Sequence, residues 1–186
     1  MAETIYLKRE ELGTLLTNLS SLPEILAGRS PKYAAFRKLF WGYVAKKLFE
    51  KIQKSFQERS HGRPDDLGNT WHPLSERRVR VKSRLHVSHG RRFKSTTPKL
   101  VNRDSGDLYR AFTPGRVTGE YVPGDESQTF RIFLGGLTVG VKVPYASQVA
   151  KTRELIPKNV NRWVQEAVNY AIEKTKVQLR SLARRT

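Results

Sequence analysis

The sequence predicts an α+β fold: an antiparallel β-sheet of about four strands, packed by a long helix and a C-terminal helix, with an extended basic arm. Two long segments repeat apolar residues every three or four positions, which is typical of helices that bury one face. Short alternating segments separated by glycine and proline turns lie between them and indicate strands. A length of 186 residues with 38% hydrophobic residues fits a single domain with its own core.

The chain divides into five consecutive parts. They are residues 1 to 29, a short strand and a modest helix; 30 to 62, the long helix; 63 to 104, a basic loop or arm; 105 to 157, a β-meander; and 158 to 186, the C-terminal helix.

The long helix carries the clearest signals at both ends. A strand at residues 5 to 7 and then a modest leucine-rich helix are expected before the long helix. Ser30 is a natural N-cap, Pro31 suits the first helical position, and Gly62 supplies the stop. One apolar stripe follows the helix: Tyr33, Phe36, Phe40, Tyr43, Val44, Leu48, Ile52 and Phe56.

The rest of the chain separates into an arm, strands and a last helix. The arm, rich in Arg, His, Ser and Pro, has few periodic apolar positions and predicts a long loop. Strands are predicted at residues 110 to 112, 115 to 122, 129 to 134 and 137 to 143. The last helix is predicted over about residues 159 to 182, with an apolar side that packs on the sheet.

Charge and cysteine content narrow the function classes. The chain has 35 Lys and Arg against 17 Asp and Glu, a formal charge of +18, with the excess in the long helix, the arm and the last helix. Such a field favours polyanions or an acidic protein surface. The absence of cysteine excludes disulfides, thiol nucleophiles and thiolate metal sites. No stretch is apolar enough to span a bilayer, and the start MAETIYLKREEL does not resemble a signal peptide, so we expect synthesis in a cytoplasm and no membrane partner.

The patterns that would indicate catalysis or cofactors are weak. His86 and His89 are spaced for a metal, but eight Lys and Arg surround them and no third ligand is near. Gly135 and Gly136 precede strand residues and read as a hairpin turn, not as a phosphate-binding loop. The pair of aspartates at residues 65 and 66 is better explained as a turn than as an acid–base pair. We therefore expect no enzyme activity, no metal and no cofactor.

Three short motifs carry more information because of their order. Residues 68 to 75 read GNTWHPLS, residues 100 to 112 read LVNRDSGDLYRAF, and residues 141 to 146 read VKVPYA. The first is a glycine-led turn that presents a tryptophan, the second a Ser-Gly turn before a short helical turn, and the third a strand that ends at a proline.

In this order, residues 30 to 182 resemble the virion morphogenesis and tail completion (neck) proteins of tailed bacteriophages. That family typically has a Gly-x-x-Trp-x-Pro-Leu-Ser turn, a basic stretch, a Leu-Val-Asp-Thr-Gly-x-Leu-like turn, and strands that end in Val-Pro-Tyr-Ala. The matching residues here are Trp71, Pro73, Leu74 and Ser75; Leu100, Val101, Asp104, Gly106 and Leu108; and Val143, Pro144, Tyr145 and Ala146.

The resemblance implies a structural protein of the virion without a reaction of its own. Its subunits would form a ring, a hexamer or else a dodecamer, at the head–tail junction. The ring would join the portal or adaptor ring to the tail terminator or tail tube and surround the DNA channel. Candidate contact residues are Trp71, Pro73, Leu74, Asp104, Gly106, Leu108, Tyr109, Pro144 and Tyr145, and core packing is the alternative for the aromatic ones.

The basic arm offers a second candidate surface. Its cations are Arg77, Arg78, Arg80, Lys82, Arg84, Arg91, Arg92 and Lys94. They would clamp an acidic neighbouring ring, or contact DNA phosphates without reading sequence. The rival hypothesis is a free, sequence-nonspecific nucleic-acid-binding protein, although no known nucleic-acid-binding module is recognisable.

Overall fold

The computed structural model describes residues 34–84, 86–88, 91–93, 99–101, 106–133 and 136–183. The predicted strand at residues 5 to 7, the first helix and the Ser30–Pro31 helix start lie outside the described residues. In chain order the elements are α3 (Ala34–Ser60), α4 (Glu76–Ser83), β1 (His86–Ser88), β2 (Arg91–Phe93), α5 (Asp107–Arg110), β3 (Arg116–Val117), β4 (Tyr121–Val122), β5 (Gln128–Phe133), β6 (Gly136–Val141), α6 (Ala146–Thr152) and α7 (Asn161–Ala183).

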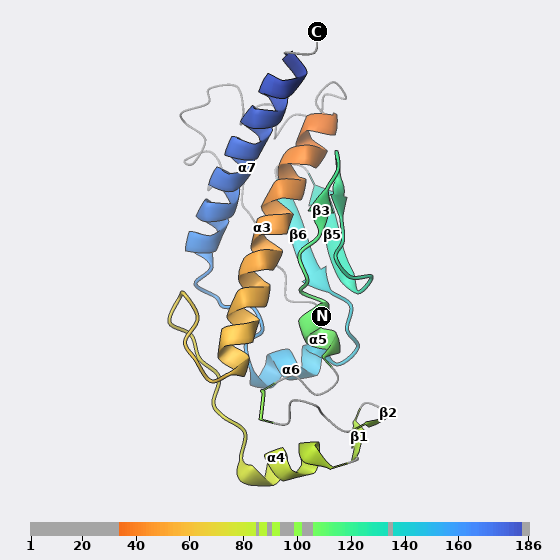
Figure 1. The fold of residues 1–186 in the computed structure, drawn as a ribbon, viewed down its shortest axis with the longest axis vertical. Coiled ribbons are helices and arrows are strands. Elements are labelled where there is room, and N and C mark those ends of the chain that lie inside the picture. Colours follow the sequence, from red (N-terminus) through yellow and green to blue (C-terminus); the bar gives the residue numbers. More distant parts are fainter. Residues whose placement is uncertain are drawn as a thin grey trace.

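Helix α3 is the centre of the fold. It lies between α7 on one side and strands β3 to β6 on the other (Figure 1). The predicted apolar stripe is therefore buried at Phe40, Val44, Leu48, Ile52 and Phe56 and half-buried at Tyr43, and Trp41 and Phe49 on other faces of the helix are buried too. Gly62, at φ 73°, follows the last turn and confirms the predicted stop.

Strands β3 to β6 form two antiparallel pairs beside the long helix, which confirms the α+β class. Strand β5 pairs with β6 from Gln128 opposite Val141 to Phe133 opposite Gly136. The segment predicted as one strand over residues 115 to 122 is a small hairpin, because β3 and β4 pair across a turn that contains Gly119 at φ 100°.

The predicted strand at residues 110 to 112 is wrong. Gly106 adopts a left-handed conformation, with φ 83°, and residues 107 to 110 then form the short helix α5. The glycine turn thus starts one helical turn directly, and the chain reaches the strands only at Arg116.

The middle of the chain is also more regular than predicted. Helix α4 occupies residues expected to form an extended arm, and β1 and β2 pair as a short hairpin after it. The Ser75 hydroxyl caps the helix by accepting a hydrogen bond from the Arg78 amide, and Glu76 stands in the first turn where a negative charge is favourable. The sequence pattern does not predict this helix, because Val79 and Val81 alone are too few to form an apolar stripe.

The C-terminal helix is confirmed as α7, which packs chiefly along α3. Its buried side is formed by Trp163, Val164, Ala167, Val168, Ala171 and Thr175, and Val160, just before the helix, is also buried. Within the ranges given above, no helix has both the length and the apolar character needed to cross a membrane.

Candidate interaction site

The three sequence motifs meet at the C-terminal end of α3. The Phe56 ring packs edge-on against Trp71, with the centroids 4.9 Å apart. It also contacts Tyr109 at 6.0 Å and Phe112 at 5.8 Å. Helix α6, which begins directly after Tyr145, lies beside α5 at this same end (Figure 1). Segments about 70 residues apart in the chain therefore form one packed junction.

The positions of the predicted contact residues divide into core and surface. Trp71 and Leu108 are 5% and 1% exposed, so their prediction as partner contacts is wrong and the alternative, core packing, holds. Leu74, Tyr109 and Tyr145 are half-buried against the core. Pro73 and Pro144 are exposed, Gly106 is half-buried, and Asp104 lies outside the described residues.

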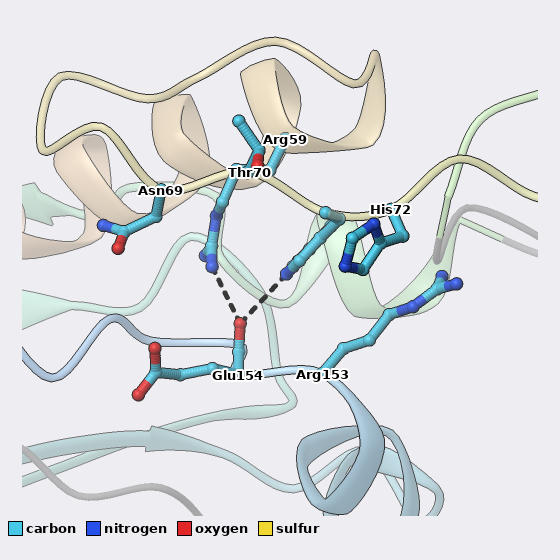
Figure 2. Close-up of a pocket in the computed structure, with 7 residues that line it drawn as sticks. Arg59, Asn69, Thr70, His72, Arg153 and Glu154 are labelled. Atoms are coloured by element: carbon cyan, nitrogen blue, oxygen red, sulfur yellow. Dashed lines mark hydrogen bonds between the residues drawn. The ribbon is translucent and has the colours of Figure 1, made fainter.

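A buried arginine ties the junction together. Arg59, in the last turn of α3, is 1% exposed, and its guanidinium donates to the backbone carbonyls of Glu154, at 2.8 Å, and Leu155. The Trp71 indole N–H donates to the same Glu154 carbonyl at 3.1 Å. Figure 2 shows both bonds converging on that oxygen. The guanidinium also lies 4.4 Å from the centre of the Trp71 ring, as a cation–π contact.

Asp65 carries the negative charge that faces Arg59, and its hydrogen bonds hold the turn before Trp71. Its carboxylate lies 3.7 Å from the Arg59 Nε, with both side chains buried. It accepts hydrogen bonds from the Ser55 hydroxyl at 2.5 Å and from the amides of Leu67 and Asn69 at 2.9 Å. The interpretation of this aspartate as a turn residue is confirmed.

As a cation on a helix that also carries Lys38, Lys46, Lys47, Lys51 and Lys54, Arg59 would be expected on a solvated face, but it is buried. The position follows Phe56 by three residues and Ile52 by seven, so it continues the apolar stripe. Helical spacing therefore could have identified it as buried.

A second charge cluster links α3 to α7. Lys51 donates to Asp66 at 3.0 Å and contacts Glu166 at 2.5 Å, while the Trp163 indole N–H donates to Asp66 at 2.7 Å. Partial burial opposes ionisation of Asp66, but the bonds from Lys51 and Trp163 outweigh it and lower the pKa of Asp66. Glu166 has a lowered pKa chiefly because of its bond to Lys51. Burial works against the Lys51 charge, yet its bonds to both carboxylates raise the pKa of Lys51.

The basic arm places most of its described cations on the surface. Arg77, Arg78 and Arg80 are exposed on α4, and Arg84 is exposed at its C-cap. The carboxylate of Glu76 lies 3.8 Å from Arg80, with the two side chains 95% and 72% exposed. An ion pair that is so exposed contributes little to the stability of the fold.

Lys82 is the exception, and its prediction as a partner contact is wrong. It is 1% exposed, and its ammonium donates to the Leu100 carbonyl at 2.6 Å. This bond satisfies the buried charge and attaches α4 to the body. The backbone of Arg91 and Arg92 forms β2, but their side chains and all of Lys94 lie outside the described residues.

In the part of the chain that the structure describes, no group of three or more His, Asp or Glu side chains is placed to hold a metal ion. Comparison with protein families, with curated proteins and with solved structures found no match to this chain. Any functional assignment therefore rests on the residues of the chain itself.

Proposed function

We propose that this protein is a structural subunit of a tailed-bacteriophage virion. It would form a homo-oligomeric ring at the head–tail junction that connects the portal or adaptor complex to the tail and surrounds the DNA channel. The observation that carries the proposal is the convergence of the three motifs. Trp71, Tyr109 and the start of α6 all lie at the C-terminal end of α3, as parts of one junction.

This convergence supports the resemblance in a specific way. Motifs that merely coincide in order have no reason to pack together, whereas motifs that define a fold do. The Trp-x-Pro-Leu-Ser segment supplies the Trp71 ring and the Ser75 cap of α4, and the Ser-Gly turn supplies the left-handed Gly106 that starts α5. Trp71, Ser75 and Gly106 thus have structural roles at this junction, which suits motifs that define a fold.

The exposed arginines of α4 give such a subunit a docking surface. Arg77 and Arg80 lie on a helix that Figure 1 places beyond α5 and α6, at one end of the molecule. We favour an acidic neighbouring ring as the partner, because tight binding of phosphates would slow DNA that has to slide through a channel.

A second candidate function is sequence-nonspecific nucleic-acid binding. The charge of +18 and the exposed α4 arginines favour it. Single-stranded nucleic acid is usually held by aromatic platforms next to the basic groups. Here Trp71 and Phe56 are buried, and Tyr109 is half-buried against the core.

The test is the mass of the native assembly, measured by light scattering at low and high salt on nucleic-acid-free protein, with and without duplex DNA. A discrete mass of six or twelve subunits, seen as closed rings by electron microscopy, supports the proposal. A stable monomer or dimer that binds DNA tightly, with affinity falling steeply as salt rises, contradicts it and favours the second candidate.

A further inference from the structure

Strands β5 and β6 pair only with each other within the described residues, so their small sheet has two open edges. Just beyond the paired residues, the Lys142 amide donates to the Ser127 carbonyl at 2.6 Å, so these two residues form a hydrogen-bonded pair. Hydrogen-bonded and non-hydrogen-bonded pairs alternate along an antiparallel ladder. The odd-numbered residues of β5 therefore direct their backbone N–H and C=O groups toward β6, whereas Phe130 and Ile132 direct theirs away from it.

The edge formed by β5 is the accessible one. Within the described residues, no backbone hydrogen bond outside the ladder involves Phe130 or Ile132. Both residues are half-buried, and Arg131 and Phe133, which alternate with them, are exposed. Strand β6 is buried over most of its length, and Figure 1 shows β5 on the side of β6 away from α7.

This edge has the features of a site for a third strand. A two-stranded hairpin is only marginally stable in water, and an exposed strand with unpaired N–H and C=O groups is a template for another strand. Strand β5 has six residues and no proline, so nothing in its backbone interrupts such pairing. Phe133, which is 40% exposed beside the edge, adds apolar surface that a further strand would cover.

Arg131 gives the edge a charge preference. It lies opposite Thr138 of β6, and its neighbours on the same face of β5 are Thr129 and Phe133, so none of these three side chains offers a carboxylate. A carboxylate on a third strand would lie directly across from its guanidinium, and a cross-strand pair of opposite charges is favourable. Two β5 strands paired in the register centred on Arg131 would instead place like charges opposite each other.

The outward backbone groups favour a polypeptide over nucleic acid. The carbonyl oxygens of Phe130 and Ile132 flank Arg131 on the open edge, and such acceptors repel the oxygens of a phosphate. An extended polypeptide offers an N–H donor and a C=O acceptor at the same spacing as the edge itself.

We infer that the β5 edge binds an extended segment of a partner protein as a third strand, with a carboxylate of that segment opposite Arg131 and apolar side chains opposite Phe130 and Ile132. The inference goes beyond the proposed ring and does not depend on it, because the partner is not a second copy of this chain. It gives the protein an interaction surface separate from the α4 arginines.

The test is a titration of the full-length protein, labelled with nitrogen-15 isoleucine, with the blocked heptapeptide Val-Thr-Val-Glu-Val-Thr-Val. When its glutamate lies opposite Arg131, the two adjacent valines lie opposite Phe130 and Ile132 and exchange hydrogen bonds with them. The Ile132 amide signal, assigned with Ile132→Val, reports on the edge, and Ile52, buried in α3, is the internal reference.

Three further probes are titrated in parallel. One peptide has glutamine in place of glutamate, and tests the charge preference. Another carries N-methyl groups on the two valines next to the glutamate, so it keeps the side chains but loses the N–H groups that would donate to β5. The third probe is a short DNA duplex.

We expect the glutamate peptide to shift the Ile132 signal in a saturable way and to leave Ile52 unchanged. The glutamine peptide should bind about two- to fivefold more weakly. The N-methylated peptide should bind at least about tenfold more weakly, because it cannot donate to the carbonyls of β5. Arg131→Gln should abolish the preference for glutamate without changing the binding of the glutamine peptide, whereas Arg116→Gln, an exposed arginine on β3, should leave that preference intact.

Five results would overturn the inference. They are the absence of a saturable Ile132 shift at millimolar peptide, equal binding of the N-methylated peptide, the same preference for glutamate in Arg131→Gln as in the native protein, stronger binding of DNA than of the glutamate peptide at this edge, and an Ile132 shift on raising the protein concentration alone. The last result would identify a second copy as the occupant. None of them decides ring formation, which the mass measurement tests separately.

Discussion

The two ends of the loop that connects α3 to α4 use arginine in opposite ways. At the end of α3, Arg59 is buried, faces Asp65 and donates to two backbone carbonyls. On α4, Arg77 and Arg80 stand exposed to solvent. The comparison teaches that in a chain with a charge of +18, cations have two separate roles. Arg59 holds the end of α3 to the rest of the fold, while Arg77 and Arg80 stand on the surface of α4.

The largest effect is expected from breaking the buried pair. In Arg59→Met, Asp65 becomes a buried carboxylate without its cation, and the Glu154 and Leu155 carbonyls lose donors. We expect the free energy of unfolding to fall by about 3–5 kcal/mol in urea denaturation. The matched control is Arg63→Met, since Arg63 is 72% exposed and should change the free energy by less than about 0.5 kcal/mol. Equal losses of unfolding free energy in the two variants would show that the buried Arg59 stabilises the fold no more than an exposed arginine does.

A smaller loss of stability is expected when Trp71, whose indole N–H donates to the same Glu154 carbonyl, is replaced. Trp71→Phe keeps an aromatic ring against Phe56 but removes the indole N–H that donates to Glu154. The Arg59 guanidinium still donates to that oxygen, so the carbonyl keeps one partner. We expect a loss of about 1–2 kcal/mol in the same denaturation experiment. An unchanged free energy of unfolding would mean that this hydrogen bond does not stabilise the junction.

The cluster between α3 and α7 should show its contribution through pH. Lys51→Met removes the cation that Asp66 and Glu166 share, and we expect a loss of about 1 kcal/mol at neutral pH. The pKa values of both carboxyls are lowered in the folded state, from ordinary values of 3.8 and 4.5. Their stabilising effect is therefore complete above those values and is lost as the pH falls through the folded pKa values.

The difference in unfolding free energy between the native protein and Lys51→Met should thus shrink as the pH falls below about 4. On the alkaline side it should persist beyond pH 10.5, because the pKa of Lys51 is raised. Lys54→Met is the control, since Lys54 is exposed on the same helix. A difference that stays constant from neutral to acid pH would refute the assignment of the effect to these carboxylates.

Sequence patterns predicted the parts of the fold that depend on repeated spacing. The stripe from Phe40 to Phe56 and the glycine stop at Gly62 were enough to identify α3 and its end. Helix α4 lacks such a stripe, and a serine followed by a run of arginines is equally typical of a polar loop. The Ser-Gly turn predicted the short helix at residues 107 to 110, whereas residues 110 to 112 were wrongly predicted as a strand because three residues are too few to establish a period.

The candidate site was less predictable because it depends on contacts that no local pattern records. Trp71 and Leu108 were predicted as partner contacts but are buried, and the burial of Trp71 depends on its packing against the distant Phe56. Glu154 matters through its backbone carbonyl, which carries no sequence signal at all. His72 and Arg153 likewise come close only because the loop before α4 lies beside the segment after α6.

The smallest effect on stability is expected from substitutions on the α4 surface. The same substitutions test most directly the proposal that this surface joins the protein to a neighbouring ring. Arg77→Gln/Arg80→Gln removes two exposed charges and should alter the free energy of unfolding by less than about 0.5 kcal/mol. The measurement is head–tail joining, counted by electron microscopy, when heads and tails made without this protein are supplemented with native or substituted protein. We predict that the native protein restores joining and that the substituted protein joins about tenfold fewer particles at equal concentration. Equal joining by both proteins, or no joining by the native one, would contradict the account.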